Sequence, residues 1–123
     1  MELKNMIWVG LGGMLGALAR YFFGLAIKSD SFPYATGLVN IIGALIMGVV
    51  MGLTLKGQIS PTLRLFLATG ICGGFTTFSA FAYNNFIMIK EHSYGQLLFN
   101  VGGNIFLGIL AVYLGIILIR VIF

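Results

Sequence analysis

One segment, Gly70–Phe81, constrains the fold of this chain more than any other part of it. Its sequence, GICGGFTTFSAF, places two adjacent glycines, three hydroxyl side chains and three phenylalanines inside an apolar stretch of membrane-spanning length. Lipid offers no hydrogen bonds to unpaired backbone groups, so a weak point of this kind indicates a broken helix that lines a site. We therefore expect this segment to interrupt a transmembrane helix in mid-membrane.

The composition argues against a soluble domain. The chain has 123 residues, of which 59% are hydrophobic and 8% are charged, and its mean hydropathy is +1.05. A small soluble domain leaves a large share of its surface in water and could not hide this much apolar area. A chain of this length allows one domain, and we expect residues 1–123 to form a single transmembrane domain.

Four apolar segments reach the roughly 20 residues that a membrane-spanning helix needs. They cover approximately residues 6–27, 34–55, 63–89 and 96–123. The connections between them are short and contain turn formers such as Pro33, Gly57 and Pro61. The sequence therefore predicts an all-α membrane protein with four transmembrane helices per chain, the third of them broken.

The basic residues are divided almost evenly between the two sides of this predicted bundle. The side that carries both chain ends holds Lys4, Lys56, Arg64 and Arg120, and the other side holds Arg20, Lys28 and Lys90. Because the Lys/Arg bias sets orientation, this near-tie predicts dual topology, although a bias of one residue could still orient the chain. Most of these charges lie in loops and at helix ends, so we expect lipid headgroups as their partner and not nucleic acid.

The acidic residues also limit the possible functions. Glu2, Asp30 and Glu91 are the only carboxylates, and each lies at a chain end or in a loop. Coupled transporters usually need an ionisable group inside the membrane, so this pattern argues against an exchanger and against a cation pore lined by carboxylates. A small dual-topology multidrug or cation exchanger stays the alternative, followed by a structural membrane subunit. The only histidine, His92, has no evident catalytic partner, and we expect no enzyme.

The glycines predict close helix packing. The chain holds 18 glycines, among them the pairs Gly12/Gly16 and Gly48/Gly52, each four residues apart on one helix face. Small residues at this spacing let helix backbones approach closely in lipid, within one chain or between two. Four helices enclose little interior, so a water-accessible path needs a second copy, and a dimer is the simplest assembly.

Uncharged polar side chains form stripes on three of the predicted spans. Threonine, serine and asparagine offer O–H and N–H donors that can replace the hydration shell of an anion and still release it. The edge of a phenylalanine ring is also electropositive and can face an anion. Each polar residue could instead bond its own helix backbone or join two helices. The candidate pathway residues are Thr36, Asn40, Thr77, Phe78, Ser79, Phe81, Asn100 and Asn104.

The predicted break has a second consequence. Interrupting the backbone ladder at Gly73–Thr76 leaves carbonyl oxygens without partners, and a hard cation accepts oxygen ligands. On a two-fold axis, two carbonyls from each copy would form a cage of four oxygens. A cation held there would be buried and structural, not transported.

The sequence resembles the Fluc/CrcB family of fluoride channels over essentially its whole length. The resemblance is carried by GGMLGALARY at Gly12–Tyr21, by Pro33, Thr36, Asn40 and Gly43 in the second span, and above all by Gly70–Phe81. It implies an antiparallel dual-topology homodimer in the plasma membrane of a prokaryote. Such a channel exports fluoride passively and lowers its toxicity in the cytoplasm.

The resemblance also implies roles for individual residues. The backbone carbonyls of Gly73 and Thr76 would bind a structural sodium ion, and Phe78 and Phe81 would line each fluoride pathway. Asn40 matches the pore asparagine of the second span, with Thr36 one turn away. Thr77 and Ser79 match a polar track on the third span, and Arg20 matches an arginine at the vestibule.

Four positions depart from the family pattern. Ala80 replaces a threonine, and Asn84 stands where a glutamate is frequent, so no role of that glutamate is carried over. On the fourth span, Asn100 and Asn104 stand where many members have tyrosine and serine. Their assignment to the pathway rests on spacing and chemistry.

Overall fold

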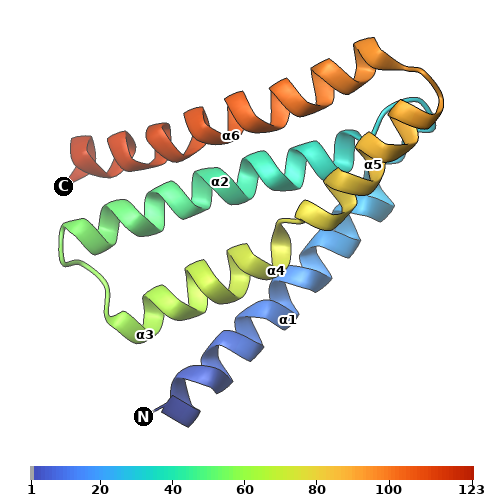
Figure 1. The fold of residues 1–123 in the computed structure, drawn as a ribbon. Helices are drawn as coiled ribbons and strands as arrows, with labels where there is room; N and C mark the ends of the chain where they lie inside the picture. Colours follow the sequence, from blue (N-terminus) through green and yellow to red (C-terminus); the bar gives the residue numbers. More distant parts are fainter. Residues whose placement is uncertain (1) are drawn as a thin grey trace.

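The apolar segments fold into helices in the computed structural model, which describes residues 2–123 (Figure 1). The elements are α1 (Glu2–Ala26), α2 (Tyr34–Leu55), α3 (Pro61–Arg64), η1 (Leu65–Cys72), α4 (Gly73–Phe75), α5 (Phe78–Lys90) and α6 (Tyr94–Ile122). Four stretches within residues 2–123 are long and apolar enough to cross a membrane: Glu2–Ala26, Tyr34–Leu55, Pro61–Lys90 and Tyr94–Ile122. The predicted all-helical fold with four membrane-capable helices is confirmed.

The third of these stretches is not one regular helix. It begins at Pro61, where the hydroxyl of Ser60 accepts a hydrogen bond of 3.2 Å from the N–H of Leu63. The coil then widens into a π-helix over Leu65–Cys72 before it returns to α geometry. Segments of π-helix are rare and occur frequently at functional sites.

The interruption falls later than the sequence indicates. Gly73 and Gly74 are helical, and the extended residues are Thr76 and Thr77. The new helix α5 starts at Phe78, where the Thr77 hydroxyl accepts a 3.1 Å hydrogen bond from the N–H of Ala80. The threonine therefore caps the second half of the span, while the glycines serve a different purpose.

That purpose is the contact between the third span and α1. A Cβ atom on Gly12 would lie 2.9 Å from the Cα of Gly70, and one on Gly16 would overlap the carbonyl oxygen of Ile71. Likewise, a Cβ atom on Gly74 would overlap the carbonyl oxygen of Gly13. The two backbones touch along this glycine seam, which fixes the position of the helix break relative to α1.

The bundle is open. Figure 1 shows α2 and α6 side by side, whereas α1 diverges from them and packs along η1 and α4. The helix α5 continues past the break toward the start of α6. Both chain ends and the α2–α3 loop lie at one end of the bundle, and the other two loops lie at the opposite end.

Large apolar side chains cover much of the outer surface. Leu18, Phe22, Phe106 and Val121 are among those that are more than half exposed. A helix that is apolar on all sides is stable only inside a protein core or in lipid. The exposed apolar surface therefore fits a protein that spans a membrane.

The glycine seam generates a stability prediction. Gly16→Ala should lower the free energy of unfolding by about 1–3 kcal/mol, because the new methyl group meets the backbone of Ile71, which cannot move aside. Gly10→Ala is the matched control on the same helix, since no atom lies within 4 Å of its added Cβ. Thermal unfolding of the two purified variants in detergent makes the comparison. Equal melting temperatures would show that the seam is not tightly packed.

Candidate functional site

The side chain of Asn40 closes the gap in the third span. Its Oδ1 accepts a hydrogen bond of 2.8 Å from the N–H of Thr77, and its Nδ2 donates one of 3.3 Å to the carbonyl oxygen of the same residue. Buried backbone groups need partners, above all inside lipid. One amide on α2 therefore satisfies both polar groups of a residue that has left the helix.

The Asn40 amide is the end of a chain of asparagines. Its Nδ2 also donates to Oδ1 of Asn104 at 3.1 Å. The Nδ2 of Asn104 lies 2.8 Å from the carbonyl oxygen of Asn100 and 3.2 Å from its Oδ1. The Nδ2 of Asn100 donates to Oδ1 of Asn85 at 2.7 Å. This chain, from Thr77 through four amides, links α2 and α6 to the second half of the third span, since Thr77 caps α5 and Asn85 lies within it.

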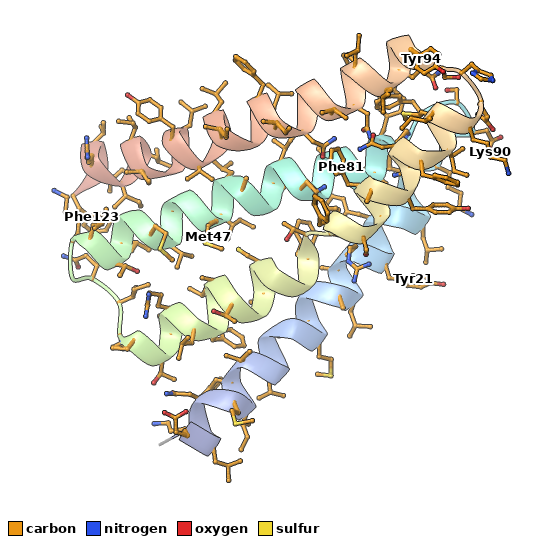
Figure 2. The ribbon with its side chains drawn as sticks, in the orientation of Figure 1. Tyr21, Met47, Phe81, Lys90, Tyr94 and Phe123 are labelled. Atoms are coloured by element: carbon orange, nitrogen blue, oxygen red, sulfur yellow. The ribbon has the colours of Figure 1, made fainter. Side chains whose placement is uncertain are left out.

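A cavity of about 350 Å³ lies against the break. The lining residues are Asn40, Thr76, Thr77, Phe78, Phe81, Asn104 and Ile105. The rings of Phe78 and Phe81 have centroids 5.9 Å apart and are tilted by 51°. Figure 2 labels Phe81 in the region where α5 passes α2. Amide, hydroxyl and aromatic groups therefore meet in one uncharged cavity, while the Phe78 ring is 79% exposed in the single chain.

A second cavity, of about 370 Å³, lies between α1, α2 and the start of α5. Arg20, Thr36 and Thr77 are among its lining residues, together with Tyr21, which Figure 2 labels. The Nε of Arg20 donates a 3.0 Å hydrogen bond to the carbonyl oxygen of Gly74. The guanidinium group is the only cationic group that lines this cavity, and Thr77 lines both cavities.

The structure does not bring all candidate residues together. Ser79 is exposed, contacts the Thr77 hydroxyl at 3.3 Å and lines neither cavity. Asn100 is 1% exposed and lines a separate apolar cavity of about 370 Å³, formed with residues such as Phe32 and Phe99. Asn40, Thr77, Phe78, Phe81 and Asn104 share one cavity, and Thr36 and Arg20 share the next.

The sequence reasoning missed Asn85 and gave Asn84 no role. Asn85 ends the asparagine chain, and Asn84 donates a 3.4 Å hydrogen bond to the hydroxyl of Thr36. The available signal was a pair of adjacent amides inside an apolar span, which is costly unless both have partners. Their partners lie on other helices, so the sequence alone could not assign them.

Backbone carbonyl oxygens at the break differ in whether they accept hydrogen bonds. Within residues 2–123, no group of three or more His, Cys, Asp or Glu side chains could hold a metal ion. The carbonyl of Cys72 accepts from Thr76, and that of Gly74 accepts from Arg20. The carbonyls of Gly73 and Thr76 accept no hydrogen bond from the described residues. Free oxygens of this kind suit a hard cation.

Known proteins with similar sequences identify the family of this chain. Residues 7–116 match the family described as "CrcB-like protein, Camphor Resistance (CrcB)". A protein of Pyrococcus abyssi named "Fluoride-specific ion channel FluC" is 43% identical over 122 residues, which cover 98% of this chain and 99% of that protein. Proteins of the same name are 41% identical over 122 residues in Pyrococcus furiosus and 38% identical over 118 residues in Thermus thermophilus.

The alignments extend over nearly the full length of each relative, and the family match includes both the glycine seam and the helix break. The four helices have the length and apolar composition of membrane spans. The chain is therefore an integral multi-pass membrane protein of the CrcB family.

Proposed function

We propose that this protein is a fluoride-selective ion channel that exports fluoride passively across the plasma membrane of a prokaryote. The observation that carries the proposal is the uncharged cavity at the helix break, where the amides of Asn40 and Asn104 face the rings of Phe78 and Phe81. Full-length relatives are named as fluoride-specific ion channels.

The two cavities define a route. An anion enters beside Arg20, whose positive charge attracts it, and meets the hydroxyls of Thr36 and Thr77. It then passes Thr77 into the cavity of Phe78 and Phe81. Ring edges and uncharged donors stabilise a small bare anion without trapping it, because none of them carries a full charge.

No observation favours the exchanger alternative. Glu2 lies at the start of α1, and Asp30 and Glu91 lie in loops. Coupled exchange needs an ionisable group within the pathway. Arg20 is the only charged residue that lines either cavity, and it is a cation.

We further propose an antiparallel homodimer that holds a structural sodium ion. Phe78 is largely exposed in the single chain, so a second copy is needed to close its cavity. Gly73 is also exposed, and its carbonyl accepts no hydrogen bond from the described residues. Across a two-fold axis, the carbonyls of Gly73 and Thr76 would supply four oxygen ligands from two chains. When bound, sodium would supply positive charge that joins the two copies.

Removing a phenylalanine ring from the proposed pathway should slow fluoride conduction. Phe78→Ile or Phe81→Ile should lower fluoride flux about fivefold, since each lost edge contact removes on the order of 1 kcal/mol of anion stabilisation. Fluoride efflux from liposomes containing the purified protein, under a potassium-set voltage, measures this. Phe123→Ile at the chain end is the matched control and should conduct normally. Unchanged flux in both pathway variants would remove the phenylalanines from the route.

A fixed negative charge at the break should block the channel. Asn40→Asp should lower fluoride flux about a hundredfold or more, because like charges about 4 Å apart repel by ~4 kcal/mol at an effective dielectric constant of 20. Asn5→Asp is the matched control, because Asn5 accepts a hydrogen bond from Thr62 and aspartate keeps that role. The same efflux assay compares them. Normal conduction with aspartate at position 40 would contradict the proposed route.

Sodium should hold the dimer together. Protein purified without sodium, with an organic cation in its place, should dissociate more readily or lose its flux, because the carbonyls of Gly73 and Thr76 then repel across the axis. Size-exclusion chromatography and the efflux assay report the two effects, and adding sodium back should restore both. A protein indifferent to sodium in both measurements would count against the carbonyl cage.

A further inference from the structure

The asparagine chain has a direction. The Thr77 N–H donates to Asn40, Asn40 donates to Asn104, Asn104 donates to Asn100, and Asn100 donates to Asn85. Along the chain, each amide therefore accepts from the neighbour nearer to Thr77, and Asn40, Asn104 and Asn100 each donate to the neighbour nearer to Asn85. Hydrogen bonds in such a chain polarise one another, so the orientation of each amide depends on its neighbours.

Two backbone groups favour this direction. The N–H of Thr77 can only donate, so Asn40 presents its oxygen to it at 2.8 Å. The carbonyl of Asn100 can only accept, so Asn104 presents its nitrogen to it at 2.8 Å. Asn40 has two bonds to the backbone of Thr77, Asn104 has one bond to a backbone group, and the side chains of Asn100 and Asn85 have none among the described residues. Inversion of Asn104 therefore breaks one backbone bond, whereas inversion of Asn40 would break two.

This direction leaves the cavity without free amide donors. Both N–H groups of Asn40 are used, by the carbonyl of Thr77 and by Oδ1 of Asn104. The Nδ2 of Asn104 is held by the carbonyl and the side chain of Asn100. Asn104 therefore turns an oxygen toward Asn40 at the edge of the cavity, and an oxygen repels an anion.

We propose that Asn85 is a positioning residue that allows Asn104 to invert and donate to the anion. This inference rests on the proposed fluoride pathway. On anion entry the amides of Asn104, Asn100 and Asn85 rotate together by half a turn. Asn85 then donates to Asn100, Asn100 donates to Asn104, and the nitrogens of Asn104 and Asn40 both point at the anion.

The exchange of hydrogen bonds has a cost that the anion must offset. The inverted chain loses the bond from Asn40 to Asn104 and the bond from Asn104 to the Asn100 carbonyl, and Oδ1 of Asn104 then faces that carbonyl, although both oxygens can only accept. It gains two bonds to the anion, which are stronger because the acceptor is charged. The buried Asn100 keeps one donated and one accepted bond in either direction, so no backbone movement is needed.

The last amide of the asparagine chain must be able to change from accepting to donating a hydrogen bond, and Asn85 fits this requirement. It is only partly buried, and its Nδ2 donates no hydrogen bond to the described residues. It is also absent from the linings of the three cavities above, so it acts only through Asn100. An amide can both accept and donate, whereas a carboxylate can only accept.

The test compares three variants by liposome fluoride efflux at several fluoride concentrations. Asn85→Asp should lock the chain in its present direction and lower maximal flux at least about tenfold, because a hydrogen bond to a charged acceptor is the stronger one. Asn85→Gln keeps both a donor and an acceptor and should stay within about threefold of wild type. Asn85→Leu removes the amide without adding a charge and should also lower flux, because position 85 can then no longer donate to Asn100 in the inverted chain.

Each outcome decides the question. A loss in Asn85→Asp without a loss in Asn85→Leu would reduce the effect to charge repulsion and overturn the proposal. Losses in Asn85→Gln as large as in Asn85→Asp, or none in Asn85→Asp, would also overturn it. Size-exclusion chromatography of each variant reports whether the assembly is intact.

A second measurement does not depend on transport. In NMR spectra of the ¹⁵N-asparagine-labelled protein, the side-chain amide signal of Asn85 is identified by its absence in Asn85→Gln. Fluoride should shift this signal, although Asn85 lines neither pathway cavity, and chloride should shift it less. If the wild-type protein conducts fluoride but the Asn85 signal does not move, the proposed inversion of the amides is overturned and the channel function is not. A wild-type protein that conducts no fluoride would instead overturn the proposed function.

Discussion

The hydrogen bonding of Thr77 is the constraint on which the rest of the structure depends. A residue that leaves a helix inside lipid exposes an N–H and a carbonyl that water cannot satisfy. Here both are satisfied by one side chain, Asn40, at 2.8 and 3.3 Å. The break is therefore a stable feature of the bundle, because a side chain of α2 supplies the missing hydrogen bonds. The same bonds hold the Asn40 amide beside Thr77, which lines both cavities.

The other half of the third span is held by different means. Glycines on both sides bring η1 and α4 against α1, and Arg20 binds the carbonyl of Gly74 from α1. Close backbone packing and a charge-assisted hydrogen bond thus fix the segment before the break, and amides fix the segment after it. Among the described residues, the carbonyls of Gly73 and Thr76 accept no hydrogen bond, and the side chain of Phe78 is largely exposed.

Much of this arrangement could be predicted from the sequence, because lipid leaves few options. The lengths of the apolar segments predict the four helices, and the segment Gly70–Phe81 indicates that the third is broken. Its position at Thr76–Thr77 could not be predicted, since the glycines have a competing role in packing against α1. Spacing placed Asn100 and Asn104 on one helix face, but only the three-dimensional structure shows that Asn100 turns toward Asn85 and away from the pathway cavity. The periodicity of one helix does not show which residues of another helix it contacts.

The π-helix has a consequence for how this sequence can evolve. Its wider coil over Leu65–Cys72 sets the angle at which the following residues leave the helix. The loss of one residue there can be absorbed, because the wide coil then closes to the ordinary coil of an α-helix. Gly74 can keep its contact with α1, and Thr77 can keep its amide partner. Single-residue deletions should therefore be better tolerated in this stretch than in the regular helices of the bundle.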